Sequence, residues 1–113
     1  MSEVDRVISV RDDPDASAFV VEVDGVRAGK AVYHVRGGRH LFVHTEVSDE
    51  FSGMGLGTRL VRETLEEMRA RGELIVPICP FFVSYLARHP EFGDVVDREM
   101  TDRLNAARAA KDD

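Results

Sequence analysis

Residues 51–78 read FSGMGLGTRLVRETLEEMRARGELIVPI, and this stretch decides the fold. After the glycines, apolar side chains recur at helical spacing and charged side chains fill the other positions, which predicts an amphipathic helix. Gly72 is suited to end that helix in a left-handed conformation. The wholly apolar run at 74–78 is typical of a strand buried on both faces. The stretch therefore predicts a glycine-rich loop, a crossover helix and a strand parallel to the one before the loop.

Upstream of the loop, the sequence predicts three strands joined by tight turns. Residues 18–23 are rich in β-branched and aromatic side chains and end at Asp24-Gly25, a dipeptide suited to a type I′ turn. Residues 26–35 form the returning strand, and a glycine pair at 37–38 offers the second reversal, into a strand over 40–47. Short connections of this kind indicate an antiparallel meander. A strand over 7–10 precedes the meander, and the turn formers at 12–15 are expected to end it.

The third meander strand alternates with period two, which predicts two distinct faces. One face is formed by Leu41, Val43, Thr45 and Val47, and the other by Phe42, His44 and Glu46. After the buried strand, Pro80 suits the first turn of a second helix that runs to His89 and ends at Pro90. A last strand at 95–96 and a weak polar helix over 98–111 complete the chain.

These elements predict an α/β (α+β) fold with a mixed sheet flanked by helices. Its 113 residues fit one domain over 1–113, with a core at about 19–96 and a polar helix or tail at 98–113. The net charge of −6 argues against nucleic acid as a partner and slightly favours a cationic substrate. The single Cys79 excludes an internal disulfide. Residues 1–5 lack a leader pattern and no apolar run could span a bilayer, so we expect a cytoplasmic location without membrane contact.

The glycines at 53, 55 and 57 lie between a strand and a helix, a position that suits phosphate binding. Such a loop exposes backbone N–H groups at the positive end of the helix dipole. Two other phosphate loops fit less well, because a P-loop needs a lysine where Gly57 precedes Thr58, and a dinucleotide fingerprint follows the first strand of its unit. A glycine-rich turn that binds no ligand is the alternative.

The order of elements resembles the core of the GNAT acetyltransferases. More narrowly, HTEV at 44–47, GMGLGTRLV at 53–61, VPICPF at 76–81 and YLARHPEF at 85–92 are similar to the small YjdJ-type branch of that superfamily. The resemblance implies acetyl-coenzyme A as cosubstrate, with its pyrophosphate on the loop amides. The residues so implied are Val47, Gly53, Met54, Gly55, Leu56, Gly57 and Thr58. GNAT loops usually begin with Gln or Arg, and Ser52 stands there in this chain, so we expect weaker pyrophosphate contact.

The chemistry requires a base, because an acceptor ammonium must lose a proton before its nitrogen attacks the thioester. The resemblance favours Glu46 as this base, and His44 on the same strand face is the alternative, since imidazole titrates near neutral pH. Tyr85 matches the GNAT tyrosine that protonates the leaving thiolate, although an amphipathic tyrosine with a buried ring is an equally simple interpretation.

Cys79 follows the buried strand, and three roles are open for it. It could be an inert core thiol, an acyl-accepting nucleophile, or a partner in a mixed disulfide with coenzyme A. We expect direct transfer in a ternary complex, as the resemblance implies. His89 is predicted to contact the last carbonyls of its helix.

Other classes of function stay open beside this one. A coenzyme A-binding module without catalysis is the main alternative. A metal site is not expected, because the histidines at 34, 40, 44 and 89 show no ligand-type spacing near Cys79. The acceptor is expected to be a small-molecule or protein amine, and the assembly a monomer or weak homodimer.

Overall fold

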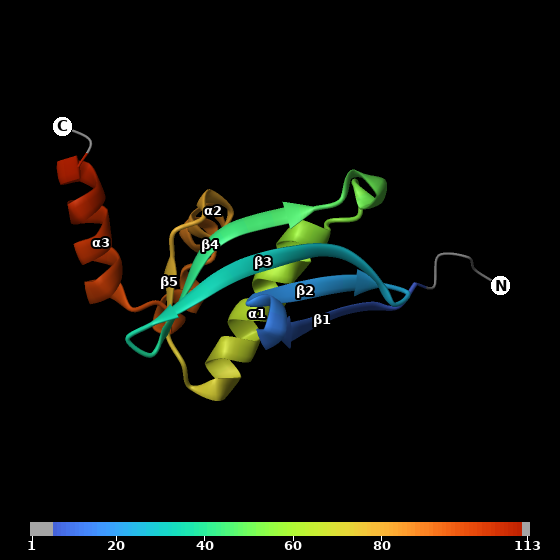
Figure 1. Ribbon diagram of the computed structural model, residues 1–113, viewed down its shortest axis with the longest axis horizontal. Helices are drawn as coiled ribbons and strands as arrows, with labels where there is room; N and C mark the ends of the chain where they lie inside the picture. The colour runs from blue at the N-terminus through green and yellow to red at the C-terminus, as the bar shows by residue number, and fades with distance from the viewer. Residues whose placement is uncertain (1–5, 112–113) are drawn as a thin grey trace.

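A five-stranded sheet in the order β1-β2-β3-β4-β5 forms the framework of the molecule, and the computed structural model describes residues 6–111 (Figure 1). The strands are β1 (Ile8–Asp13), β2 (Ala18–Val23), β3 (Val26–Arg36), β4 (Arg39–Val47) and β5 (Ile75–Pro77). The helices are α1 (Leu56–Arg71), α2 (Pro80–Arg88) and α3 (Arg98–Lys111), with short 3₁₀ turns at Pro14–Ala16, Asp49–Phe51 and Pro90–Val95. The predicted mixed α/β architecture is confirmed.

Strands β2, β3 and β4 form the predicted antiparallel meander, and β1 extends it by antiparallel pairing with β2. Both tight turns have the backbone that their residues suggested, since Asp24 and Gly25 have φ of 51° and 83° and Gly37 and Gly38 have φ of 55° and 77°. Positive φ at both central positions matches the twist of the flanking strands. These dipeptides therefore fix where each hairpin reverses.

The fifth strand pairs with β4 in parallel, as the crossover through α1 predicted. The pairing is short, because it joins only His40–Phe42 to Ile75–Pro77. In Figure 1 the lime-coloured helix α1 crosses behind the meander, and α2 lies behind the end of the sheet that carries β5. Both helices contribute to one hydrophobic cluster with the sheet.

Aromatic side chains link the sheet to the helices within that cluster. Phe42 of β4 stacks on Phe82 of α2 with ring centroids 4.5 Å apart, and it also packs against Phe19 of β2. Leu60 and Met68 of α1 are fully buried in the same cluster. Burying one such side chain stabilises a fold by about 1.5–3 kcal/mol. Helices α1 and α2 are therefore anchored on one face of the sheet.

The predicted end of the first strand was wrong, because β1 continues through Asp12 and Asp13. Strand pairing is possible there because both carboxylates have partners. Asp12 accepts hydrogen bonds from Tyr33 Oη at 2.7 Å and from Arg71 at 3.0 Å, and Asp13 accepts one from Arg27 at 2.9 Å. The strand ends only at Asp13, where the 3₁₀ turn Pro14–Ala16 begins.

The predicted faces of β4 were wrong across Val43, where the strand contains a β-bulge, although His44 and Glu46 share one face as predicted. Tyr33 pairs with Phe42 and Val32 pairs with His44, which leaves Val43 without a partner in the register. An extra residue moves every later side chain to the opposite face. Phe42 and Val47 consequently both face the hydrophobic cluster, although an odd spacing would place them on opposite sides of a regular strand.

The chain after α2 differs from the prediction in two further ways. In place of a last strand at 95–96, residues 90–95 form a 3₁₀ turn and Val96 makes a single parallel bridge with Ile75. The His89 side chain does not bond the last carbonyls of α2, because its ring stacks on Tyr85 and Nδ1 lies 3.3 Å from Glu91. The terminal helix is confirmed as α3, which packs mainly on β5.

Candidate functional site

The glycine-rich loop leaves the N-terminus of α1 without a cap. Gly53 and Gly55 have φ of 83° and 69°, a region that side chains rarely adopt, and Gly55 occupies the N-cap position. No side chain caps this end, and the first turn contains no acidic residue. The amide of Arg59 donates a helical hydrogen bond to the carbonyl of Gly55. The amides of residues 56–58, at the start of α1, therefore have no carbonyl partner within the helix. The loop therefore offers N–H groups to an anion.

A shallow hollow of about 300 Å³ lies over these amides. It is lined by Val47, Ser48, Asp49, Phe51, Ser52, Gly53, Gly55, Leu56, Gly57, Thr58 and Phe81. A side chain added at Gly53 or Gly55 would meet nothing within 4 Å, so both positions open toward solvent. The structure thus brings Val47 together with the loop residues named from the sequence, except that Met54 is not part of the lining.

Phe81 is a residue of this site that the sequence did not reveal. Its ring is 40% exposed and lies so close to Gly57 that an added Cβ there would be 2.8 Å from Phe81 Cζ. Gly57 is therefore required for close packing of α2 on the loop. The only signal in the sequence was the pair of adjacent phenylalanines after Pro80, of which a helix can bury just one.

Strands β4 and β5 separate immediately after Phe42. The amides of Ile78 and Cys79 both donate to the Phe42 carbonyl, at 3.0 and 2.8 Å, and no strand within residues 6–111 pairs with β4 on that side beyond it. The Cys79 side chain is 5% exposed and donates to Thr45 Oγ1 at 3.3 Å. Thr45 was not predicted as a site residue, because its contact with Cys79 depends on the bulge.

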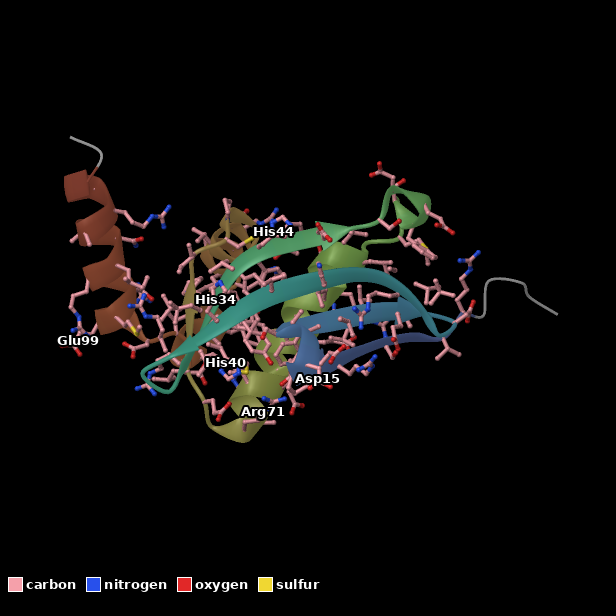
Figure 2. All side chains as sticks on the ribbon, in the orientation of Figure 1. Asp15, His34, His40, His44, Arg71 and Glu99 are labelled. Carbon is pink, nitrogen blue, oxygen red and sulfur yellow. The ribbon has the colours of Figure 1, made fainter. Side chains whose placement is uncertain are left out.

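The predicted base candidates lie on the other face of β4, pointing away from the hydrophobic cluster. His44 Nε2 lies 3.0 Å from Glu46 Oε1, and Lys30 Nζ of β3 lies 3.7 Å from Glu46 Oε2. The hydrogen bond with His44, and then the charge of Lys30, lower the pKa of Glu46 below its ordinary value. Figure 2 shows His44 along β4, whereas His40 and Arg71 are grouped elsewhere in the molecule. Lys30 was missed because a regular hairpin would place it opposite Thr45.

Tyr85 lies apart from these groups. The side chain is 3% exposed, its ring is stacked on His89 with centroids 4.0 Å apart, and it does not line the hollow at the loop. Burial raises the pKa of its hydroxyl group. Tyr85 belongs to the same buried cluster as Cys79, but no side-chain hydrogen bond within residues 6–111 joins it to Cys79, His44 or Glu46.

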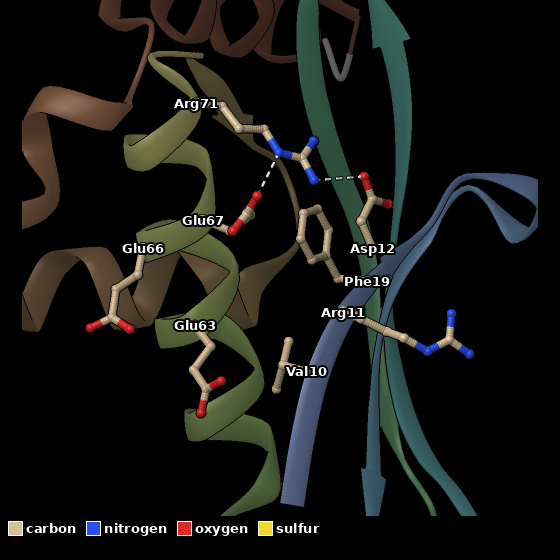
Figure 3. Close-up of a pocket in the computed structure, with 8 residues that line it drawn as sticks. All are labelled: Val10, Arg11, Asp12, Phe19, Glu63, Glu66, Glu67 and Arg71. Carbon is tan, nitrogen blue, oxygen red and sulfur yellow. Dashed lines mark hydrogen bonds and ion pairs between the residues drawn. The ribbon is translucent and has the colours of Figure 1, made fainter. Parts of the chain in front are cut away.

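A larger hollow, of about 540 Å³, lies between β1 and the C-terminal half of α1 (Figure 3). Arg71 is the centre of the ion pairs within it. Arg71 donates to Glu67 at 2.9 Å and to Asp12 at 3.0 Å, and its guanidinium lies 5.5 Å from the centre of the Phe19 ring. These contacts tie α1 to the sheet, so we assign this hollow a structural role.

Residues 6–111 contain neither a metal site nor a membrane-spanning helix. No three His, Cys, Asp or Glu side chains in this part of the chain are grouped as ligands for a metal ion. No helix within the same range is long and apolar enough to cross a membrane.

The chain matches a known protein family over most of its length. A family model described as GCN5-related N-acetyl-transferase matches residues 18–95, which run from β2 to the 3₁₀ turn after α2. The match contains the glycine-rich loop, the divergence of β4 from β5 and the His44–Glu46 pair, and it leaves β1 and α3 outside. No curated protein matches the chain.

Proposed function

The chain belongs to the GCN5-related N-acetyltransferase family, and on that premise we propose that it transfers the acetyl group of acetyl-coenzyme A to an amine. The observation that carries the proposal is the uncapped N-terminus of α1, which has two glycines at positive φ and no acidic residue in its first turn. A pyrophosphate group needs such a site, because it requires close approach to several N–H donors.

The loop residues named above are proposed to hold the pyrophosphate of coenzyme A. Gly53 and Gly55 open onto the hollow, so a phosphate could approach the backbone there without meeting a side chain. Ser52 replaces the usual long side chain of the family and adds no positive charge. The contact therefore depends on backbone amides and on the dipole of α1.

The unpaired edge of β4 is proposed to bind the pantetheine arm. Antiparallel pairing uses alternate backbone groups, and the Ser48 amide bonds to the Ala28 carbonyl on the β3 side. Residues 45 and 47 are therefore expected to direct their backbone groups toward the side that β5 has left. The thioester is accordingly proposed to lie near Thr45 and Cys79, where the two strands diverge.

The proposed reaction is direct transfer in a ternary complex. The amine first loses a proton to a base on the protein, and its nitrogen then forms a bond to the acetyl carbon while the carbon–sulfur bond breaks. The thiolate of coenzyme A leaves and takes up a proton, and the newly bonded nitrogen releases its surplus proton to water, which leaves a neutral amide. Glu46 and His44 are the candidates for the base, and Tyr85 or water is the candidate donor to the thiolate.

The finer features of this function are proposals as well. The small YjdJ-type branch is proposed for the chain on the motifs that contain His44, Cys79 and Tyr85. The acceptor is a small-molecule or protein amine, and the net charge of −6 favours one with additional positive charge. We propose no nucleic-acid partner, and an assembly no larger than a weak homodimer.

The test is an assay of thiol release from acetyl-coenzyme A with a panel of amines, together with calorimetry of coenzyme A binding. Transfer to at least one amine is expected. Binding of coenzyme A with no turnover on any amine would instead indicate a binding module, and failure to bind would refute the proposed site.

Cys79→Ala separates direct transfer from a covalent route. Direct transfer predicts that the variant keeps at least about a tenth of wild-type activity, since the loss of a positioning contact costs at most about 1.4 kcal/mol of barrier. Mass spectrometry of the wild-type protein mixed with acetyl-coenzyme A alone gives an independent measurement. Stoichiometric acetylation of Cys79, reversed by adding amine, would establish the acyl-enzyme route instead.

A further inference from the structure

Three polar side chains form a connected group on the face of the sheet away from α1 and α2. His44 and Glu46 are two residues apart on β4, and Lys30 is the cross-strand partner of Glu46 on β3. The His44 and Glu46 side chains are 58% and 55% exposed. The group is therefore accessible to an acceptor that approaches the open face.

The β-bulge at Val43 creates this group. In a regular hairpin from the Gly37-Gly38 turn, Lys30 would stand opposite Thr45, and His44 would share the cluster-facing side with Phe42. The extra residue brings Lys30 opposite Glu46 and turns His44 outward. The same bulge lies where β4 and β5 diverge, so His44 is adjacent in the strand to Thr45, the residue that contacts Cys79.

The contacts within the group assign different roles to its members. An ionised carboxylate can only accept a hydrogen bond, so the 3.0 Å contact requires the proton of the neutral imidazole to be on Nε2. The lone pair of Nδ1 is then free to accept a proton. Glu46 is engaged through Oε1 by His44 and faces Lys30 through Oε2, and both contacts favour its ionised, unprotonated form.

We infer that His44 is the base that takes the proton from the amine, and that Glu46, flanked by Lys30, is a positioning residue that holds the imidazole in the required tautomer. This inference rests on the proposed acetyl transfer. The acceptor ammonium gives one proton to Nδ1, and the nitrogen lone pair then forms a bond to the acetyl carbon as the carbon–sulfur bond breaks and the thiolate of coenzyme A leaves. The newly bonded nitrogen releases its second proton to water, and His44 later releases the first proton to water. Glu46 stays ionised throughout.

The kinetic test compares three variants in the amine assay. His44→Gln should lower kcat by about 100-fold or more, because it removes the base. Glu46→Gln should lower kcat by roughly 10-fold, since exposed orienting contacts are individually weak. Lys30→Met should change it by less than about 3-fold. A larger loss for Glu46→Gln than for His44→Gln would overturn the assignment and make Glu46 the base.

Matched controls come from the same sheet. Glu22→Gln removes a partly buried carboxylate that pairs with Arg11 at 3.1 Å, and His34→Gln removes an exposed histidine of β3 (Figure 2). Both should leave kcat unchanged. A loss in these controls as large as that of His44→Gln would also overturn the assignment, because it would show that the effect is not specific to this group.

A spectroscopic measurement tests the contact without any substrate. The ¹⁵N shifts of the His44 ring should report the Nε2–H tautomer in the wild-type protein at neutral pH and a mixture of tautomers in Glu46→Gln. An identical tautomer distribution in the two proteins would refute the positioning role of Glu46. If the wild-type protein acetylates no amine, the proposed function fails, and this measurement still decides whether Glu46 orients His44.

Discussion

The two ends of α1 differ in how their terminal backbone groups are bonded. At the C-terminal end, Gly72 has φ of 72° and its amide, with that of Glu73, bonds the last carbonyls of the helix. Arg71 there is paired with Asp12 and Glu67. At the N-terminal end, Gly55 has a similar φ of 69°, but no side chain caps the helix. The polar groups at the C-terminal end bond to one another and stabilise the fold, whereas the amides at the N-terminal end are proposed to bind a ligand.

The largest effect is expected from an acidic side chain at the uncapped N-terminal end of α1. Gly55→Asp places a negative charge beside the amides proposed for the pyrophosphate. We expect the Kd for coenzyme A to rise by roughly 100-fold, equivalent to about 2.8 kcal/mol. Gly72→Asp is the matched control, because Gly55 and Gly72 have nearly equal backbone angles and the same strain of about 1 kcal/mol applies to both. Calorimetry that gives equal Kd values for the two folded variants would refute the proposed site.

A smaller effect is expected from a substitution at the C-terminal end of α1. Arg71→Met removes the ion pairs with Asp12 and Glu67 and the contact with the Phe19 ring. The free energy of unfolding should fall by about 1 kcal/mol, as is typical of partly exposed pairs. Denaturant titration measures this change. The affinity for coenzyme A should be unaffected, and a joint loss of stability and affinity would show that the two ends of α1 are not independent.

The smallest effect is expected from replacing His40, which lies near the C-terminal end of α1. Burial lowers the pKa of His40 below its ordinary value of 6.5, although the charges of Glu73 and Asp12 oppose this shift and that of Arg71 adds to it. The unfolded chain therefore binds the proton more readily, so the stability present above pH 6.5 declines as the pH falls. We expect His40→Phe to reduce the loss of Tm between pH 7.5 and 5.5 by roughly 2 °C. Parallel Tm curves for the two proteins would contradict this prediction.

Much of the fold could be predicted because its signals are local. The Asp24-Gly25 and Gly37-Gly38 turns, the stripe on α1 and the terminator Gly72 each depend on residues close together in sequence. The end of β1 could not be predicted, because Asp12 is tolerated in a strand only through Tyr33 and Arg71, which come from β3 and α1. Sequence reasoning treats such a carboxylate as unpaired.

The candidate site was predictable only in part for the same reason. The glycines at 53–58 indicate an open loop before the helix, so the position of the hollow could be predicted from the sequence. The orientation of His44 and Glu46 and their approach to Lys30 follow from the bulge at Val43, and nothing in the residues around Val43 signals it. Phe81 shares this difficulty, because its contact with Gly57 requires the packing of α2 on the loop.

The short parallel pairing of β4 with β5 also affects the order of folding. The hairpins of the meander join neighbours in sequence, whereas this pairing must bring His40 to Ile75 across the whole of α1. Closing the longer segment costs more chain entropy, so we expect the β4–β5 pairing to form after the hairpins, together with the groove where the two strands diverge beyond Phe42. Contacts that form late mainly control the unfolding rate. A cosubstrate bound in that groove would consequently prolong the life of the native state and leave the rate of refolding nearly unchanged.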